Sequence, residues 1–279
     1  MSDTLNIDSI LQEMKAGSNP LMHIALLDSV DSTNDWCLQQ CRENRVLPFA
    51  CVTDNQTRGR GRLGNHWQSA PGASITMSIA WKFEGQPDQM GMLSLAMGMA
   101  VVDVLRAHDI EHAMLKWPND VIVNHHKIAG ILIETAMVDG QLDVVIGIGL
   151  NYDIGAVVSG QTESDLDSFS WTDFCRCLDA EALESEAVTG RSELIGELLN
   201  ECLTMCERYQ HDYDALSVEF DSRYNAYISA PVNVRLGNGK VIEGISLGTT
   251  KQGELRVLVE EDEQVFNSAE ISLRRAVEC

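Results

Sequence analysis

Residues Gln56–Trp67, QTRGRGRLGNHW, place three glycines and three arginines between two β-rich runs. Phe49–Asp54 precedes the stretch and Ser74–Phe83 follows it. Glycine lets backbone N–H groups approach a ligand closely, and the arginine guanidinium fits carboxylate or phosphate oxygens. Three arginines within five residues repel one another unless an anion gathers them. The stretch therefore predicts an anion-binding loop, which we call the glycine–arginine loop.

Three other interpretations of this loop compete with an anion site. Gly59, Gly61 and Gly64 match the dinucleotide pattern G-x-G-x-x-G, but that pattern requires a helix to begin at its third glycine, and a turn and a strand pattern follow here. A solvated flexible loop is the second interpretation, and a contact with nucleic acid is the third. The formal net charge of -22 argues against a nucleic-acid-binding protein, because affinity for phosphate backbones depends on basic surface.

Composition predicts a soluble, cytoplasmic protein. With 279 residues, of which 44% are hydrophobic, the chain can bury a full core and should form one large domain and one small one. It contains no uncharged apolar run of about 18 residues and no cationic–apolar signal peptide. The eight cysteines follow no C-x-x-C or cysteine–histidine pattern, which favours structural thiols in a reducing compartment over a zinc site.

Periodicity and capping predict the main helices. Apolar residues predict helices at Met90–His108 and Ser192–Phe220, and Ser32 is a good N-cap for a helix that runs to about Cys41. Ile7–Met14 is a short amphipathic segment, and the acidic stretch 153–190 should hold a loop and short helices. The strands expected before residue 153 are His23–Ser29, Phe49–Asp54, Ser74–Phe83, part of Met114–Asn124, Lys127–Met137 and Leu142–Leu150.

The segment 114–150 carries candidate site residues. Pro118 excludes an ordinary central strand position, so Lys116–Asp120 should form a turn that presents polar groups beside a strand. Lys127 opens a strongly apolar strand after a hairpin tip at His125-His126, and Asp139-Gly140 predicts a second hairpin turn. The return strand contains Gly147 and Gly149, which suggests that a ligand lies against the backbone there.

The C-terminal region changes pattern at Ala230-Pro231. Short strands are expected at Val232–Leu236, Val241–Leu247, Leu255–Val259 and Ile271–Leu273, with a solvated hairpin tip at Glu260–Glu263. They predict a small β-barrel of about 50 residues. We therefore expect two domains, residues 1–229 and residues 230–279.

These motifs, in this order, resemble the biotin protein ligases, the biotin–[acetyl-CoA-carboxylase] ligases. The resemblance spans roughly Asp28–Arg275. It implies an α/β (α+β) fold, in which a mixed-sheet catalytic domain precedes an SH3-like β-barrel. The motifs that carry it are Asp31-Ser32-Thr33-Asn34, Gln56 with Gly59–Gly64 and Trp67, Lys116–Asp120, Lys127–Leu132, Gly147–Asn151 and Ile271–Arg274.

The resemblance implies a reaction in two steps. Biotin and ATP form biotinyl-5′-AMP and pyrophosphate, and a lysine of a biotin carboxyl carrier protein, in acetyl-CoA carboxylase or a related carboxylase, then takes the biotinyl group. Two anions must be brought together, so catalysis depends on positioning and on cationic groups. Mg²⁺ would accompany ATP, and no residue is identified as its ligand.

The resemblance also assigns roles to residues. Lys127 and Arg62 would be catalytic and would neutralise the biotin carboxylate and the α-phosphate. Ser32, Thr33 and Gln56 would contact the ureido end of biotin, Trp171 would cover adenine, and Arg274 would reach from the barrel to the nucleotide. The biotin-binding set is Ser32, Thr33, Asn34, Gln56, Arg60, Gly61, Arg62, Lys127, Gly147 and Gly149. The ATP-binding set is Arg60, Arg62, Trp67, Lys116, Asn119, Asp120, Asn151, Trp171 and Arg274.

Two alternatives to this function stay open from the sequence. A lipoate ligase or octanoyltransferase that acts on lipoyl domains would share the catalytic fold and a comparable lysine, although Arg60, Arg62 and Lys116–Asp120 favour biotin. A DNA-binding regulator would need a basic recognition helix, which the sequence lacks. We therefore expect the ligase alone, without the N-terminal DNA-binding domain of the bifunctional ligase–repressors. We expect no nucleic-acid or membrane partner and consider a homodimer possible. Asn65 stands where the family often has a basic residue, which puts an auxiliary phosphate contact in doubt.

Overall fold

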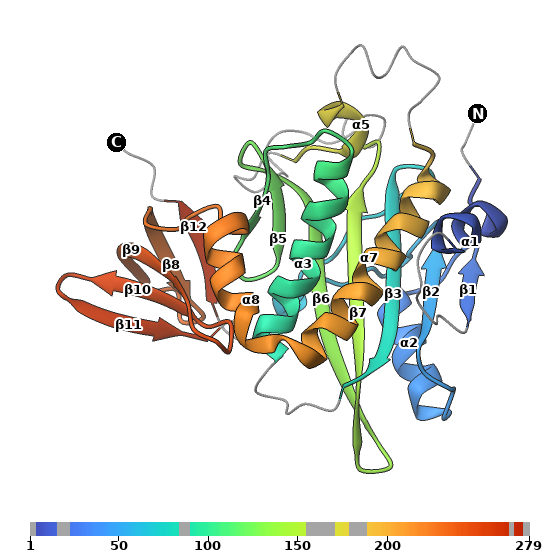
Figure 1. Ribbon diagram of the computed structural model, residues 1–279, viewed down its shortest axis with the longest axis horizontal. Coiled ribbons are helices and arrows are strands. Elements are labelled where there is room, and N and C mark those ends of the chain that lie inside the picture. Colours follow the sequence, from blue (N-terminus) through green and yellow to red (C-terminus); the bar gives the residue numbers. More distant parts are fainter. Residues whose placement is uncertain are drawn as a thin grey trace.

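The structure, a computed structural model, describes residues 4–15, 23–83, 90–154, 171–178, 189–267 and, for the backbone, 271–275. A large sheet is covered by helices, and a smaller sheet lies beside its β4 end (Figure 1). The long stretch around 153–190 that we expect to hold a loop and short helices lies mostly outside the described residues. Helix α5 (Phe174–Cys177) is described within it.

The large sheet is mixed, as predicted. Its order is β1-β2-β3-β7-β6-β5-β4; β1 pairs with β2 in parallel, and all other neighbours are antiparallel. In that order the strands are Ile24–Leu27, Phe49–Thr53, Ser74–Lys82, Gln141–Asn151, His126–Val138, Asp120–Val123 and Ala113–Lys116. The two predicted hairpin tips are present, with positive φ at Asn124 and His125 and at Asp139 and Gly140.

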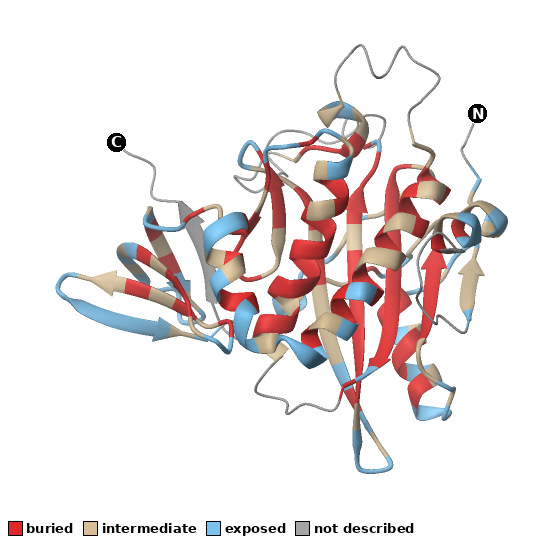
Figure 2. Cartoon of the chain, in the orientation of Figure 1, coloured by how far each residue is buried: buried red, intermediate tan, exposed pale blue. Residues whose placement is uncertain are grey.

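Both faces of the sheet are buried, because alternate residues of each strand enter two different cores. On β2, Ala50 and Val52 join the main core under α3 (Met90–Ala107) and α7 (Arg191–His211). Phe49 and Cys51 join a second core under α2 (Thr33–Arg42). Helix α1 (Ile7–Lys15) packs against α7 through the buried Ile10. The buried side chains therefore extend across the central strands and the inner faces of the helices (Figure 2).

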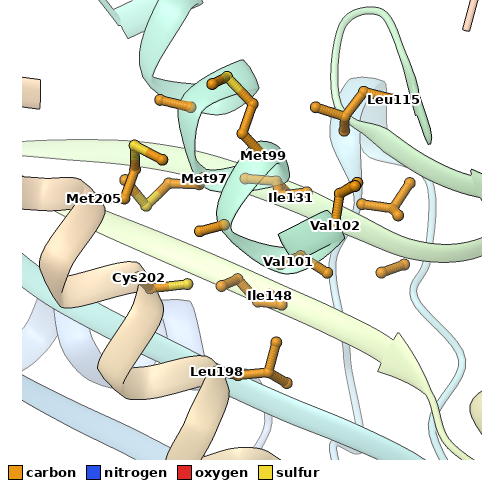
Figure 3. Packing of buried hydrophobic residues seen from close by; sticks show 14 of the residues in the cluster. Met97, Met99, Val101, Val102, Leu115, Ile131, Ile148, Leu198, Cys202 and Met205 are labelled. Atoms are coloured by element: carbon orange, nitrogen blue, oxygen red, sulfur yellow. The ribbon is translucent and has the colours of Figure 1, made fainter. Parts of the chain in front are cut away.

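Helix α3 is long and apolar enough to cross a membrane by length and composition alone. Most of it is buried, and its side chains interdigitate with those of the sheet and of α7. Figure 3 shows Met97 and Val101 of α3 near Ile148 of β7 and Cys202 of α7. Helix α3 is therefore the central helix of the core, and its methionines fill that core.

The prediction of one continuous helix over Ser192–Phe220 is wrong, because the structure divides this segment into separate helices. Helix α7 ends at His211, and α8 (Tyr213–Glu219) and the π-helical turn Phe220–Tyr224 follow. Asp212, with φ −133° and ψ 34°, interrupts the helical path between α7 and α8. The chain then turns towards the small sheet.

The small sheet is antiparallel, has the order β11-β10-β9-β8-β12 and forms the expected SH3-like part. Its strands, in chain order from β8, are Pro231–Leu236, Val241–Thr249, Leu255–Val259, Asp262–Phe266 and Ile271–Arg275. The prediction of a hairpin tip over Glu260–Glu263 is only half right, because β11 already begins at Asp262. Most of β11 is exposed, so it lacks the alternating apolar residues that identify a strand in a sequence.

Candidate functional site

The first part of the site is a buried polar network at the N-terminus of α2. Ser32 caps the helix, because its hydroxyl accepts a hydrogen bond of 3.4 Å from the backbone N–H of Asp35. Gln56 Oε1 accepts hydrogen bonds from Thr33 N at 2.8 Å and from Thr33 Oγ1 at 3.2 Å. The structure therefore brings together Ser32, Thr33 and Gln56, the residues predicted to contact the ureido end of biotin.

Ser78 on β3 belongs to the same network, and the sequence analysis missed it. Its Oγ lies 2.7 Å from Thr33 Oγ1 and 2.6 Å from Asn34 Oδ1, and the residue is fully buried. Alternating hydroxyl residues in β3, at Ser74, Thr76 and Ser78, were the available signal, because a buried polar group needs a hydrogen-bond partner.

Arg60 lies at this network and forms ion pairs with two carboxylates. Its guanidinium is 2.6 Å from Asp35 on α2 and 2.6 Å from Glu134 on β6. Asn34 Nδ2 also donates to Glu134, at 2.8 Å. Sequence reasoning assigned Arg60 to biotin and phosphates and did not anticipate Glu134 or Asp35. Within the described residues, Arg60 Nε is buried and has no hydrogen-bond partner.

The glycine–arginine loop is held together by the chain's own acidic groups. Arg58 forms an ion pair with Asp31, as Arg60 does with Asp35 and Glu134. The loop backbone closes on itself, because Trp67 N donates to Gly59 O at 3.0 Å and Gly61 N donates to Asn65 O at 2.8 Å. Two of its three arginines are therefore neutralised by carboxylates before any ligand binds, contrary to the expectation that an anion gathers them.

A second, cationic part of the site surrounds Asp120 at the start of β5. Its carboxylate is 2.5 Å from Lys127 Nζ and 3.3 Å from Lys116 Nζ. Burial alone would raise the pKa of Asp120, but the charges of Lys127 and Lys116 hold that pKa below its ordinary value. Arg62 Nη1 donates to Asn119 Oδ1 at 3.2 Å, and burial lowers the pKa of this guanidinium. Two lysines thus pair with one carboxylate, and Arg62 is bonded to the residue beside it.

Two indoles join the cationic part of the site. The ring centroids of Trp67 and Trp171 lie 6.2 Å apart at 70°, and Lys127 Nζ lies 5.7 Å and 5.6 Å from them. Trp67 Nε1 is buried and has no hydrogen-bond partner among the residues that the structure describes. Lys127 is thus held between Asp120 and two aromatic faces, which attract a cation.

Other side chains of the protein pack closely against the backbone of Gly147 and Gly149. A Cβ on Gly147 would lie 2.3 Å from Asn34 Oδ1, and one on Gly149 would lie 2.4 Å from Trp67 Cε2. A ligand was expected against this backbone. The structure instead places there two residues from the predicted biotin and ATP sets.

Asn151 and Arg274 are the two remaining predicted site residues, and the structure describes the side chain of Asn151 only. Asn151 Nδ2 donates to Thr172 O at 3.0 Å and to Lys127 O at 3.5 Å, so it links β7 to the segment that carries Trp171. Arg274 lies on β12, where its backbone pairs with Asn233. Its side chain lies outside the described part of the chain.

Comparison with known proteins decides the family. The model of the Biotin/lipoate A/B protein ligase family matches residues 26–151, and the model of the Biotin protein ligase C terminal domain matches residues 230–274. The "Bifunctional ligase/repressor BirA" of Escherichia coli (strain K12) is 32% identical over 276 residues, which are 98% of this chain and 79% of that protein. The chain belongs to the biotin protein ligase family.

Other members of the biotin protein ligase family agree. The "Biotin--[acetyl-CoA-carboxylase] ligase" of Mycobacterium tuberculosis is 33% identical over 208 residues, 73% of this chain and 71% of that protein. The "Biotin protein ligase from Aquifex aeolicus in complex with biotin and ATP" has a TM-score of 0.70 at 25% identity and covers 92% of this chain and 100% of its own. The predicted fold and the predicted enzyme class are confirmed, and the lipoate alternative is not supported.

The described residues hold no cluster of potential metal ligands. No group of three or more His, Cys, Asp and Glu side chains gathers within them. Both oxygens of Asp120 are engaged by lysines. Mg²⁺ keeps most of its water and binds through few carboxylates, so it needs no such cluster, and its place beside ATP stays a prediction.

Proposed function

We propose that this ligase joins biotin to ATP in the space between its two polar clusters. The ureido group of biotin would lie at Thr33, Asn34, Gln56 and Ser78, and its carboxylate would reach the cations around Asp120. The observation that carries this proposal is that Lys127 and Lys116 pair with Asp120, and Arg62 bonds to the adjacent Asn119, in a chain whose net charge is -22. An anionic substrate is therefore attracted by this cluster and not by the protein as a whole.

In the first step an oxygen of the biotin carboxylate forms a bond to the α-phosphorus of ATP, and the bond from that phosphorus to the pyrophosphate oxygen breaks. Charge spreads over the phosphate oxygens in the transition state, so fixed cations stabilise it. Lys127 and Arg62 are assigned this role. The ion pair with Asp120 and the two indoles hold the ammonium of Lys127 in place, which lowers the reorganisation needed during reaction.

In the second step the ε-amine of a carrier lysine attacks the acyl carbon of biotinyl-5′-AMP. An amide bond forms, the bond between the acyl carbon and the phosphate oxygen breaks, and AMP leaves. Trp67 and Trp171 would cover the intermediate and exclude water, which would otherwise hydrolyse it. Biotin ligases act on biotin carboxyl carrier proteins in general. We assign this chain the carrier domain of acetyl-CoA carboxylase or a related carboxylase.

The domain boundary at residues 229 and 230 is part of the proposal, with the catalytic residues on the first domain. It is supported by the match of residues 230–274 to the C-terminal domain model and by the change to a separate sheet at β8. A homodimer, a cytoplasmic location and the absence of nucleic-acid binding remain predictions.

An isotope-exchange assay tests the first step. We expect the protein to transfer label from pyrophosphate into ATP only when biotin and Mg²⁺ are present, because the adenylation must then run backwards. Lipoate and octanoate serve as comparison acids in parallel reactions. Exchange that depends on lipoate but not on biotin would contradict the assignment of the pocket, while no exchange with any of these acids would contradict adenylation.

A further inference from the structure

The turn between β4 and β5 lies between the large sheet and the small one. It contains Trp117 and Pro118, and it is flanked by Lys116 on β4 and by Asn119 and Asp120 on the β5 side. Figure 1 shows β4 and β5 as the strands of the large sheet nearest to the small sheet. The turn thus connects predicted ATP-binding residues with the C-terminal part of the chain.

Trp117 is directed into the protein and is held by the small sheet. Its side chain is 1% exposed, and its Nε1 donates a hydrogen bond of 2.9 Å to the backbone carbonyl of Gly253. Gly253 lies in the turn between β9 and β10, 136 residues further along the chain. A buried carbonyl that loses its donor keeps its full desolvation penalty, so this hydrogen bond is costly to break.

The β9–β10 turn, which carries the Gly253 carbonyl, is itself held rigidly in place. Gly253 has φ +78°, and a Cβ there would lie 2.5 Å from the backbone N of Met92, so this turn lies directly against the first turn of α3. A Cβ on Gly91 would in turn lie 2.7 Å from Gln252 O. The β9–β10 turn is closed by hydrogen bonds of 2.9 Å from Thr250 N to Glu254 O and from Gly253 N to Thr250 O. Backbone packed on backbone leaves no side chain that could yield.

The other side of the β4–β5 turn is fixed to the site. Asn119 Nδ2 donates to Ile131 O at 2.9 Å, and Ile131 N donates to Asn119 O at 3.0 Å. Helix α3 holds the middle of the turn, because Ser94 Oγ donates to Pro118 O at 3.2 Å. The turn is thus held at three points, and Trp117 is the point at which the small sheet holds it, next to Lys116.

We propose that Trp117 is a positioning residue, through which the small sheet sets the location of Lys116, Asn119 and Asp120 for the nucleotide. The hydrogen bond to Gly253 is the connecting element. The biotin network around Thr33 and Gln56 is built from α2, β3 and the glycine–arginine loop and does not involve this turn. The effect of Trp117 should therefore fall mainly on ATP, because biotin keeps its contacts with the polar network even where its carboxylate shares the cations around Asp120. This inference rests on the proposed function.

The test is Trp117→Phe, which keeps an aromatic ring and removes the indole donor. We expect the KM for ATP in the biotin-dependent exchange assay to rise at least about fivefold, the scale of one lost buried hydrogen bond. The affinity for biotin, measured by calorimetry, should change less than about twofold. Trp81→Phe is the matched control: Trp81 is also buried, but its Nε1 has no hydrogen-bond partner among the described residues, so both constants should stay as in the wild type.

A second variant separates the hydrogen bond from the loss of volume. Trp117→3-benzothienylalanine keeps the bicyclic shape and lacks the N–H, and it should reproduce the rise in the KM for ATP even if Trp117→Phe folds poorly. An unchanged KM for ATP in this variant, or equal losses for ATP and biotin together with a lower Tm, would overturn the inference. A wild-type protein without biotin-dependent exchange would instead overturn the proposed function, so the two failures are distinguishable.

Discussion

Glu134 Oε2 lies 2.6 Å from Arg60 Nη2 and thereby joins the glycine–arginine loop to strand β6. The same oxygen accepts from Asn34 Nδ2, so one carboxylate fixes both the loop and the first turn of α2. The residues predicted to contact biotin are therefore held in place by a charge that has no assigned contact with biotin. This arrangement explains how a loop rich in glycine can be ordered around a ligand.

Glu134→Gln should weaken biotin binding by about tenfold, because charge-assisted hydrogen bonds to Arg60 and Asn34 become neutral ones. Titration calorimetry with biotin measures the effect. The control is Asp31→Asn, which removes the exposed partner of Arg58 on the same loop and should change biotin affinity less than about twofold. Equal losses in both variants would show that any charge on the loop matters and that Glu134 has no special role.

Lys127→Ala should fold and lose adenylation by at least roughly 10²-fold, the usual scale for one electrostatic stabiliser. The lysine is placed where the biotin carboxylate and the α-phosphate would meet. The rate of biotin-dependent pyrophosphate release checks this prediction. Lys251→Ala, which removes an exposed lysine paired with Asp214, is the control and should release pyrophosphate at the wild-type rate. Near-normal release from Lys127→Ala would remove this residue from the mechanism.

Asp120→Asn should destabilise the protein by roughly 3 kcal/mol at neutral pH, because it leaves two largely buried lysines without their shared carboxylate. The pKa of Asp120 in the folded protein is below its ordinary value of 3.8. Asp120 therefore stabilises the folded protein fully above about pH 4. This stabilisation is lost as the pH falls through the lower pKa that Asp120 has in the folded state. Urea unfolding of both proteins between pH 7 and pH 3 measures the difference, which should shrink only at the acid end. A difference that does not vary with pH would contradict an ionised Asp120.

Gly149→Ala should cost about 1–3 kcal/mol of stability, because its Cβ would meet the Trp67 ring at 2.4 Å. A double-mutant cycle isolates this contact. In a Trp67→Ala background the same glycine substitution should cost much less, since the ring is gone. Equal costs in both backgrounds, measured by denaturant unfolding, would show that Trp67 does not lie on this strand.

Much of the fold was predictable from the sequence because most of its helices and strands have strong local sequence patterns. The apolar helix α3, the hairpin tips at His125 and Asp139, and the change at Pro231 each follow from composition and turn chemistry within a few residues. Strand β11 and the interruption at Asp212 lack such patterns. Their positions depend on pairing and packing with distant segments.

The site was predictable by residue type but not by partner. The sequence singled out Lys127 and Arg62, which lie in the cationic part of the site, and Thr33, which lies in the polar network, because their motifs resemble those of a known family. It could not show that Arg60 pairs with Glu134, because that contact depends on the packing of α2 and the loop against β6. Ser78 was missed for the same reason: its neighbours on the buried face of β3 come from α2.

The most direct test of the central claim is intact mass spectrometry of a biotin carboxyl carrier domain incubated with this protein, ATP, Mg²⁺ and biotin. The account predicts a mass increase of one biotinyl group that requires ATP and that Lys127→Ala slows by at least roughly 10²-fold. A parallel reaction contains a lipoyl domain with lipoate or octanoate. Acylation of the lipoyl domain without biotinylation of the carrier would contradict the account, and so would an unmodified carrier in the complete reaction.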